Sequence, residues 1–308
     1  MRMRLSKRRL LILSTCGLFG VIIFLLIPLS QEPRELPDKF VVSVDPVRQE
    51  IVAMDGPEAD YFFDNPTVEN IRDVMIENVA SVNNAINPAI KYVHITSGLR
   101  KEQIADRFAN VLGWSAEEKA KFIALDHPTG IVDPEGYYFP GTYTVHTGET
   151  SASVSEKMFF NFEQEVEARF ATSTTKMISL DTALKIASLI EREAAGKHDM
   201  RLISGIIWNR MFSGMNLEID ATLQYAKGTS KNWWPQVVPK DKYINSPYNT
   251  YKYKGFPPTP IANPGLASIQ AALNPEKTDC LFYIHDTRRR IHCAKTYTQH
   301  KRNIAIYY

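Results

Sequence analysis

The amino-terminal thirty residues constrain the chain most, because they combine a basic cluster with a long apolar run. The run covers residues 10–29, which is the length of a helix that crosses the hydrocarbon core of a bilayer. Five cations precede it: Arg2, Arg4, Lys7, Arg8 and Arg9. By the positive-inside rule such a cluster stays in the cytoplasm. We therefore predict a cytoplasmic basic tail over residues 1–9, a transmembrane helix over 10–29 and an outward-facing remainder.

A cleaved signal peptide is the alternative interpretation of this segment. Signal peptides end in a small-x-small cleavage site, and residues 27–30 (Ile-Pro-Leu-Ser) are a poor one, so retention of the helix is favoured. The following residues, 30–39, are polar and contain Pro33 and Pro37, which is typical of an extended linker. We expect this linker to hold a globular region away from the membrane.

Charge and cysteine content limit the classes of function. Beyond the basic tail, the chain contains thirty-one basic and thirty-four acidic residues, and this near-neutral charge argues against a nucleic acid as partner. We interpret Cys16, inside the apolar run, as a buried thiol. Cys280 and Cys293 bracket a predicted hairpin centred near Arg288, about three positions out of register, so two separate thiols are favoured over a disulfide.

Three stretches share the pattern of a short aromatic or β-branched strand, a turn and an amphipathic helix. They lie at residues 61–79, 92–111 and 141–162. Such a mixture predicts an α+β fold. The rest of the chain is expected to contain helices over 181–195 and 199–212, a proline-rich loop region over 235–275, a hairpin of 281–285 with 291–295, and a final helix near 297–308.

The helix predicted over residues 181–195 carries the strongest candidate for a catalytic residue, Glu191. At about 100° per residue, Glu191 shares its arc with small side chains that leave space for a ligand. A half-hidden carboxyl group is what a general acid in a carbohydrate-cleaving site requires. The alternative is a surface acid paired with a cation such as Arg192. Glu193 points nearly the opposite way, and we predict that it forms a solvated pair with Lys197.

Two further acids, Glu218 and Asp220, alternate with Leu217 and Ile219 as in a strand, which would place both carboxylates on one face. That face is either a sugar-binding edge or the solvated side of the strand. Aromatic residues crowd the loop that follows, and their rings suit pyranose sugars as well as membrane or protein interfaces. They are Trp233, Trp234, Tyr243, Tyr248, Tyr251 and Tyr253.

Motifs for metals and cofactors are missing from the sequence. No histidine pair has the i, i+4 spacing of a helical zinc motif, and there is no nucleophile elbow, phosphate-binding loop or dinucleotide fingerprint. We expect neither a metal nor a cofactor.

Several further motifs occur in order along roughly residues 60–308. They are EGYYFP at 135–140, ASLIERE at 187–193, WNRM at 208–211, GMNLEIDAT at 214–222, YNTY at 248–251, GFPPTPIANPG at 255–265, and the late Leu281, Phe282 and Tyr283 with His292 and His300. Together these motifs resemble the endolytic murein transglycosylase family, also called YceG-like. The amino-terminal anchor fits this family as well.

The resemblance implies a YceG-like catalytic domain over residues 91–308, preceded over 40–90 by a truncated LysM-like region. It implies cleavage of the β-1,4 bond between N-acetylmuramic acid and N-acetylglucosamine in nascent peptidoglycan strands, leaving a 1,6-anhydro end and terminating elongation. The site would face outward from a bacterial cytoplasmic membrane. Peptidoglycan strands are the implied substrate, and peptidoglycan synthases are candidate partners.

The family's catalytic glutamate falls on Glu191, which would protonate the leaving oxygen and then accept the proton of the sugar's own 6-hydroxyl. The resemblance implies that seven further residues bind the substrate: Glu218, Asp220, Thr222, Gln224, Tyr248, Asn249 and Tyr251. The chain departs from the family where Glu218 replaces a usual glutamine, Ala221 a usual proline and Gly141 a usual aspartate.

Two other functions are compatible with these residues. A muramidase-like hydrolase would use the same acid, with Asp220 or Glu218 activating a water molecule. A non-catalytic scaffold of the growth or division machinery would bind the wall without cutting it.

Overall fold

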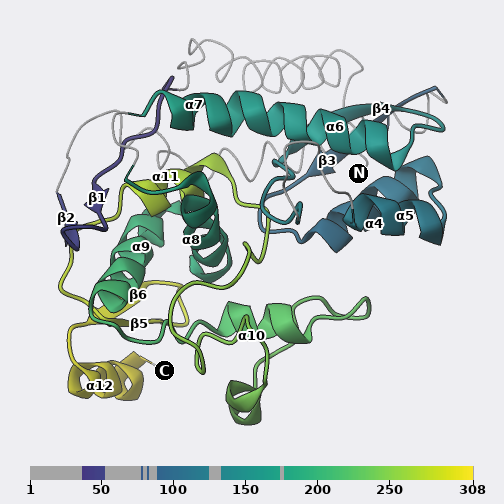
Figure 1. Cartoon of the computed structure of the whole chain (residues 1–308). Coiled ribbons are helices and arrows are strands. Elements are labelled where there is room, and N and C mark those ends of the chain that lie inside the picture. The colour runs from purple at the N-terminus through teal and green to yellow at the C-terminus, as the bar shows by residue number, and fades with distance from the viewer. Residues whose placement is uncertain are drawn as a thin grey trace, which may run out of the picture. The chain divides into compact units, whose positions relative to one another are not determined.

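Three small antiparallel sheets and a larger set of helices form the part of the chain that the computed structural model describes, residues 37–52, 78, 82, 89–124, 133–173 and 177–307. This mixture confirms the α+β class (Figure 1). The predicted basic tail, membrane helix and strand-helix unit at 61–79 lie outside the described residues, apart from single positions. Within the described residues, none of the helices is both long and apolar enough to cross a bilayer.

The amino-terminal half contains the two strand-helix units predicted within the described residues. Strands β3 (Ile90–Ile95) and β4 (Gly141–His146) pair antiparallel, with Ile95 opposite Gly141. Helices α4 (Lys101–Leu112) and α6 (Ser151–Phe162) follow their strands, and α5 (Ala116–Ile123) lies between them in sequence. Helix α6 continues through a π-helical turn, η1 (Glu163–Glu167), into α7 (Ala168–Ala171). One apolar core joins these elements: Val93, Ile95, Ile104, Phe108, Phe122, Tyr138, Val154 and Met158.

Three helices surround the second core. Helix α8 (Leu180–Glu193) packs against α9 (Lys197–Phe212) and α11 (Leu266–Leu273), as Figure 1 shows to the left of its centre. The first two confirm the predicted helices. Glycine is required at 205, because a Cβ there would lie 2.2 Å from the carbonyl oxygen of Glu276. The close contact lets the chain after α11 run directly over α9.

Residues 40–52, part of the range 40–90 that the resemblance assigns to a truncated LysM-like region, contribute to this second core. They contain the short strands β1 (Val44–Asp45) and β2 (Glu50–Ile51). The side chains of Phe40, Val44 and Ile51 are buried in the core, and the backbone N–H of Val41 donates to Gln270 Oε1 at 3.0 Å. This segment is therefore anchored on α11.

The strand predicted over residues 217–220 is wrong. Glu218 has a φ of 53°, in the left-handed region, and Asp220 already begins a helix, α10 (Asp220–Lys227). The backbone N–H groups of Glu218 and Ile219 donate to the carbonyl oxygen and the hydroxyl of Thr250, respectively. Hydrogen bonds to Thr250, a loop residue, rather than to a neighbouring strand therefore fix the path of this segment.

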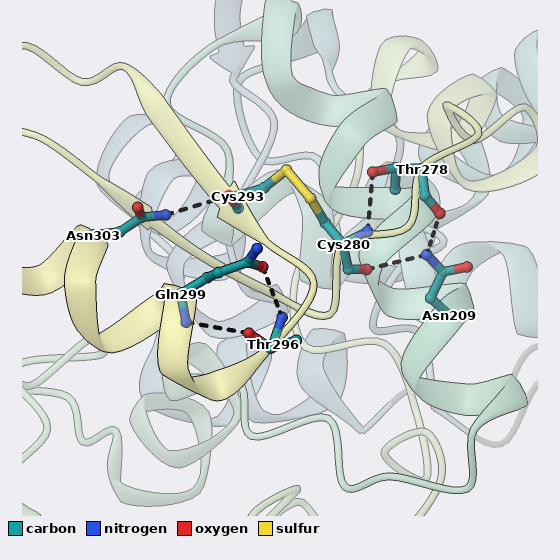
Figure 2. The surroundings of a disulfide bond; sticks show 7 residues. All are labelled: Asn209, Thr278, Cys280, Cys293, Thr296, Gln299 and Asn303. Atoms are coloured by element: carbon teal, nitrogen blue, oxygen red, sulfur yellow. Dashed lines mark hydrogen bonds between the residues drawn. A yellow bond between two sulfur atoms is a disulfide. The ribbon is translucent and has the colours of Figure 1, made fainter.

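The carboxyl-terminal hairpin confirms the predicted strands, as β5 (Phe282–His285) and β6 (Ile291–Ala294), followed by α12 (Tyr297–Tyr307). The prediction of two separate thiols is wrong, because Cys280 and Cys293 form a disulfide (Figure 2). The register itself is as expected, with Cys293 opposite Tyr283. Cys280 precedes β5 and is not paired within the sheet, and its carbonyl oxygen accepts a hydrogen bond from Asn209 instead. Its Cα lies 5.8 Å from that of Cys293, which allows the disulfide.

Candidate active site

Glu191 lies in the last turn of α8, and three hydrogen bonds hold its carboxyl group. Ser97 Oγ is 2.5 Å from Oε1, while Ser268 Oγ and the backbone N–H of Gly265 are 2.6 Å and 3.2 Å from Oε2. Ser97 is exposed and Ser268 is buried, so one oxygen of the half-buried carboxyl lies toward solvent. A hydroxyl group can donate or accept, so this arrangement accommodates both the charged and the protonated carboxyl.

Two loops deliver these partners. Ser97 follows β3 in a turn with Gly98, whose φ is 77°, and a Cβ on Gly98 would lie 3.5 Å from Glu191 Cγ. Gly265 is the N-cap of α11, and Ser268 lies in the first turn of that helix. The positive φ of Gly98 favours glycine there, whereas a Cβ at Gly265 would meet Glu191 Oε2 at an ordinary contact distance of 3.9 Å.

Asn263 ties the two loops together. Its backbone carbonyl oxygen accepts from Gly98 N–H at 2.9 Å, and its own N–H donates to Leu99 O at 2.8 Å. Its side-chain oxygen accepts from the N–H groups of Gly136 and Tyr138, and its Nδ2 donates to Leu99 O and Glu135 Oε1. The residue is fully buried and uses all of these groups. It joins the motifs at 135–140 and 255–265 behind the site.

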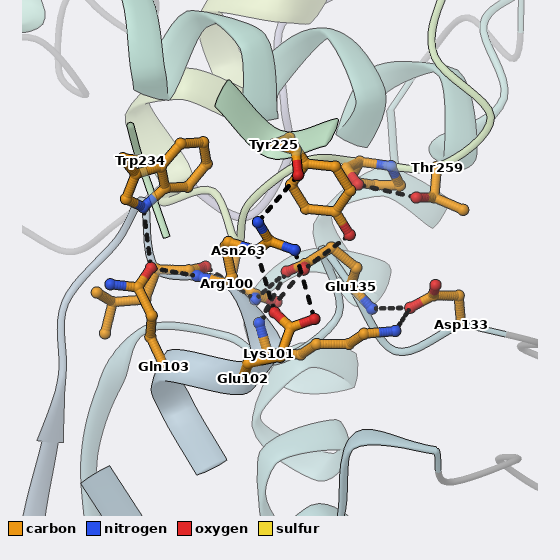
Figure 3. A network of polar contacts seen from close by, with 12 residues as sticks. Arg100, Lys101, Glu102, Gln103, Asp133, Glu135, Tyr225, Trp234, Thr259 and Asn263 are labelled. Carbon is orange, nitrogen blue, oxygen red and sulfur yellow. Dashed lines mark hydrogen bonds and ion pairs between the residues drawn. The ribbon is translucent and has the colours of Figure 1, made fainter. Parts of the chain in front are cut away.

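Glu135 is the acid of this buried network (Figure 3). Its carboxyl group accepts from the N–H of Lys101, from Asn263 and from the hydroxyl of Tyr225. Burial, with a smaller contribution from the charge of Glu102, raises the pKa of Glu135 to about 8. Because Lys101, Tyr225 and Asn263 all donate to it, Glu135 connects α4, α10 and the loop that carries Asn263.

Cations stacked on aromatic rings hold α10 and the loop after it near this network. The Arg100 guanidinium lies 4.0 Å from the ring centre of Tyr225 and 4.9 Å from that of Trp233. Arg192, next to Glu191, lies 3.8 Å from the ring centre of Trp234 and donates to Gly98 O. Arg192 therefore supports the turn carrying Ser97, and burial lowers the pKa of its guanidinium.

The predicted solvated pair of Glu193 with Lys197 is wrong. Glu193 Oε2 accepts from the hydroxyl of Tyr283 at 2.7 Å, and its Oε1 accepts from the N–H of Ala221 at 3.4 Å. Burial raises the pKa of Glu193 despite these hydrogen bonds. The sequence pattern showed a cation at i+4, but the hairpin, ninety residues away in sequence, covers this side of the helix instead.

The acids predicted to bind substrate are exposed and have partners outside the surroundings of Glu191. Glu218 forms an ion pair with Arg210 at 3.0 Å, and Asp220 Oδ1 accepts from the hydroxyl of Tyr251 at 2.6 Å. Asp220 lies on the Glu193 side of α8, because the adjacent Ala221 donates to Glu193.

The other predicted binding residues divide by burial. Thr222 and Asn249 are fully buried, where Thr222 donates to Ile219 O and Asn249 donates to the carbonyl oxygens of Lys242 and Ile244. Gln224 and Tyr248 are half-buried, and Tyr248 packs on Tyr225 with ring centres 4.8 Å apart. Thr222 and Asn249 thus shape the backbone around the exposed groups.

Sequence reasoning missed the partners of Glu191. Ser97 and Ser268 lie 94 and 77 residues away from it in sequence, so no local periodicity could connect them. The available signals were the serine-glycine turn after a predicted strand and the glycine at the end of the motif at 255–265. Both place small residues beside the carboxyl group.

Comparison with known proteins identifies the family of this chain. The model of the YceG-like family matches residues 65–306, and the chain belongs to that family. An endolytic murein transglycosylase of Bacillus subtilis (strain 168) is 38% identical over 169 residues, which cover 54% of this chain and 46% of the relative. One of Streptococcus pneumoniae serotype 2 (strain D39) is 33% identical over 174 residues, which cover 56% of this chain and 32% of the relative.

The matched region therefore spans less than half of each of these relatives. A solved structure shares the fold over a larger part of both chains. The 2.6 Å crystal structure of a yceG-like protein from Listeria monocytogenes superposes with a TM-score of 0.62 and 29% sequence identity. The superposition covers 74% of this chain and 80% of that chain.

Proposed function

We propose that this chain is an endolytic lytic transglycosylase of peptidoglycan. It would cleave the β-1,4 bond between N-acetylmuramic acid and N-acetylglucosamine within nascent strands, forming 1,6-anhydro-N-acetylmuramic acid and terminating strand elongation. The observation that carries the proposal is the carboxyl of Glu191, held by Ser97, Ser268 and Gly265 with one oxygen toward solvent. The names of the two bacterial relatives support the same activity.

The reaction needs one carboxyl group acting twice. Protonated Glu191 donates its proton to the glycosidic oxygen while the bond from that oxygen to the anomeric carbon breaks, and the leaving sugar departs with a free hydroxyl. The 6-hydroxyl of the remaining sugar then attacks the anomeric carbon and returns its proton to Glu191. An internal nucleophile has an effective molarity on the order of 10⁵ M or more in well-oriented cases, so no activated water is required.

The surroundings of Glu191 favour this chemistry over hydrolysis. A hydrolase needs a second carboxylate to activate water. Among the described residues, Asp220 accepts a hydrogen bond from Tyr251, and Glu218 accepts one from Arg210. Neither Tyr251 nor Arg210 is a hydrogen-bond partner of Glu191 in this part of the chain. Both acids, with Tyr251, Gln224 and Tyr248, are proposed to bind the glycan, and buried Thr222 and Asn249 to position them.

The proposed location is the cytoplasmic membrane of a bacterium, with residues 10–29 as a single transmembrane helix, the amino terminus in the cytoplasm and the catalytic region outside. The disulfide between Cys280 and Cys293 supports an outward location, because disulfides persist in oxidising compartments and are rare in the cytosol. Peptidoglycan synthases acting on the same strands are proposed partners.

The test uses full-length protein incubated with purified peptidoglycan and mass spectrometry of the products. Wild type should generate new 1,6-anhydro ends. Glu191→Gln should lower their formation by about 10²–10⁴-fold, the range of general acid-base catalysis, with unchanged thermal stability. Glu163→Gln, which removes an exposed acid from η1, is the matched control.

Each other outcome has a distinct meaning. New reducing ends in place of anhydro ends would identify a hydrolase. No new ends from the wild type would favour the wall-binding scaffold. An unchanged product profile in Glu191→Gln would refute the assignment of Glu191.

A further inference from the structure

The loop that follows α10 carries a surface of lysine and tyrosine side chains that the proposed reaction does not use. It consists of Lys240, Lys242, Tyr243, Lys252, Tyr253 and Lys254, called here the Lys/Tyr surface. The first three belong to or border the short 3-10 helix η2 (Pro239–Tyr243). Tyr243 is 84% exposed and Tyr253 is 42% exposed, although tyrosine rings are largely apolar.

Local hydrogen bonds fix the shape of this surface. Buried Asn249 donates to the carbonyl oxygens of Lys242 and Ile244, and its side-chain oxygen accepts from the N–H of Lys252. Asn245 accepts from both Lys252 Nζ at 2.9 Å and the Tyr253 hydroxyl at 2.7 Å. The two lysine-tyrosine segments are thereby held side by side.

The charge of this region differs from that of the rest of the chain. Residues 227–254 contain six lysines and one acid, whereas the remaining residues after the basic tail contain twenty-five basic and thirty-three acidic residues. That one acid, Asp241, forms an ion pair with Lys227. Within the described part of the chain, none of the lysines of the Lys/Tyr surface makes an ion pair, unlike Lys101, Lys119, Lys157 and Lys185.

We propose that the Lys/Tyr surface docks on the anionic phospholipid headgroups of the membrane that holds the chain. Lysines near an anionic bilayer gain electrostatic attraction, and amphipathic tyrosine rings are favoured at the headgroup level. A soluble polyanion would account for the lysines alone, but it would not favour exposed rings in the same way. The inference rests on the proposed membrane anchor. Residues 30–39 extend over at most roughly 35 Å, which limits how far Phe40 can lie from the end of that anchor.

The tether makes weak docking sufficient. A surface linked to the bilayer by about ten residues meets headgroups at a high effective concentration, so each contact needs little affinity. Each lysine near the surface strengthens docking by about fivefold, and the strength declines with salt. Docking would hold the catalytic region at a defined height above the bilayer, where membrane-linked strands emerge.

The experiment uses the full chain with Cys16→Ser, reconstituted in nanodiscs, and a nitroxide attached at Val238→Cys, which borders the surface. Collision rates with oxygen, which partitions into lipid, and with a water-soluble nickel chelate report the depth of the label. A second label at Thr287→Cys, on the exposed tip of the β5–β6 hairpin, is the control position.

We expect the label at 238 to lose at least half of its accessibility to nickel when zwitterionic lipids are replaced by lipids containing 30% phosphatidylglycerol. The triple variant Lys240→Gln, Lys252→Gln, Lys254→Gln should abolish the change, whereas Lys277→Gln, Lys301→Gln should preserve it. Lys242 is left intact, because it lies 4.6 Å from the ring centre of Tyr251.

Equal accessibility in both lipids would overturn the proposal, and so would a change that survives in the triple variant. An effect of soluble polyphosphate without any effect of phosphatidylglycerol would instead assign the surface to a soluble anionic polymer. Failure of the proposed function is distinguishable, since a chain that lacks the anchor would not enter nanodiscs and Glu191→Gln should leave the label unchanged.

Discussion

Glu191 and Glu193 lie two residues apart in the last turn of α8, yet their surroundings differ in kind. Glu191 is held by two serine hydroxyls and one backbone N–H, and Ser97 reaches solvent. Glu193 is held by the phenol of half-buried Tyr283 and by the N–H of Ala221. Because a helix turns by about 100° per residue, the two side chains leave the axis about 200° apart.

The difference shows how one helix end would serve both the proposed chemistry and packing. A carboxyl group that exchanges protons with a substrate needs neighbours that tolerate both of its charge states, as hydroxyls do. Glu193 instead joins α8 to α10 through the N–H of Ala221 and to the β5–β6 hairpin through the phenol of Tyr283. The fold and the proposed catalysis therefore make separate demands on positions two residues apart.

The largest effect is expected from the hydroxyls around Glu191. Hydrogen bonds to a charged group contribute about 1.5–3 kcal/mol each, so Ser97→Ala with Ser268→Ala should lower the rate of anhydro-end formation by about 10²-fold or more. Ser204→Ala is the matched control, because the hydroxyl of buried Ser204 has no hydrogen-bond partner in the described structure. Full activity of the double serine variant would contradict the role assigned to these hydroxyls.

A smaller effect is expected on the Glu193 side, where the disulfide fastens the hairpin that carries Tyr283. Closing a loop with a sequence separation of 13 stabilises the fold by about 2–3 kcal/mol. Cys280→Ser with Cys293→Ser should lower the free energy of unfolding in urea by that amount, and Cys16→Ser should not. The comparison would fail if the double variant were as stable as the parent, since the hairpin would then need no cross-link.

Local patterns were sufficient for most of the elements. Apolar periodicity predicted α8 and α9, and a hairpin around the turn near Arg288 predicted β5 and β6. The strand at residues 217–220 failed, because Thr250 captures the backbone there and Glu218 adopts a left-handed conformation. Alternation of polar and apolar residues does not reveal hydrogen bonds between this segment and a distant loop residue such as Thr250.

The candidate site was predictable only in part. Position on the helix and the family motifs indicated Glu191, but its partners come from loops far away in sequence. Asn263 was visible only as one letter of a motif, although it joins three segments behind the site. The role of Glu193 was missed because a lysine at i+4 is a local signal, while Tyr283 is brought to it by tertiary packing alone.

The smallest effect concerns pH and separates the two sides of α8 further. Burial raises the pKa of Glu193 above its ordinary value of 4.5, so the folded state holds that proton more tightly than the unfolded state. Its contribution to stability is present below pH 4.5 and is lost as pH rises through the folded-state pKa, by at most about 1.4 kcal/mol per pH unit. Glu135 acts in the same direction up to about pH 8.

Two substitutions should move this pH dependence in opposite directions, as measured by urea unfolding between pH 5 and 8. Glu193→Gln should make the decline in stability shallower, because the titrating group is gone. Tyr283→Phe should make it steeper, because the hydrogen bond that lowers the pKa of Glu193 is removed. Identical slopes in both variants would show that Glu193 titrates as a solvated acid, and the contrast with Glu191 would then rest on hydrogen-bond geometry alone.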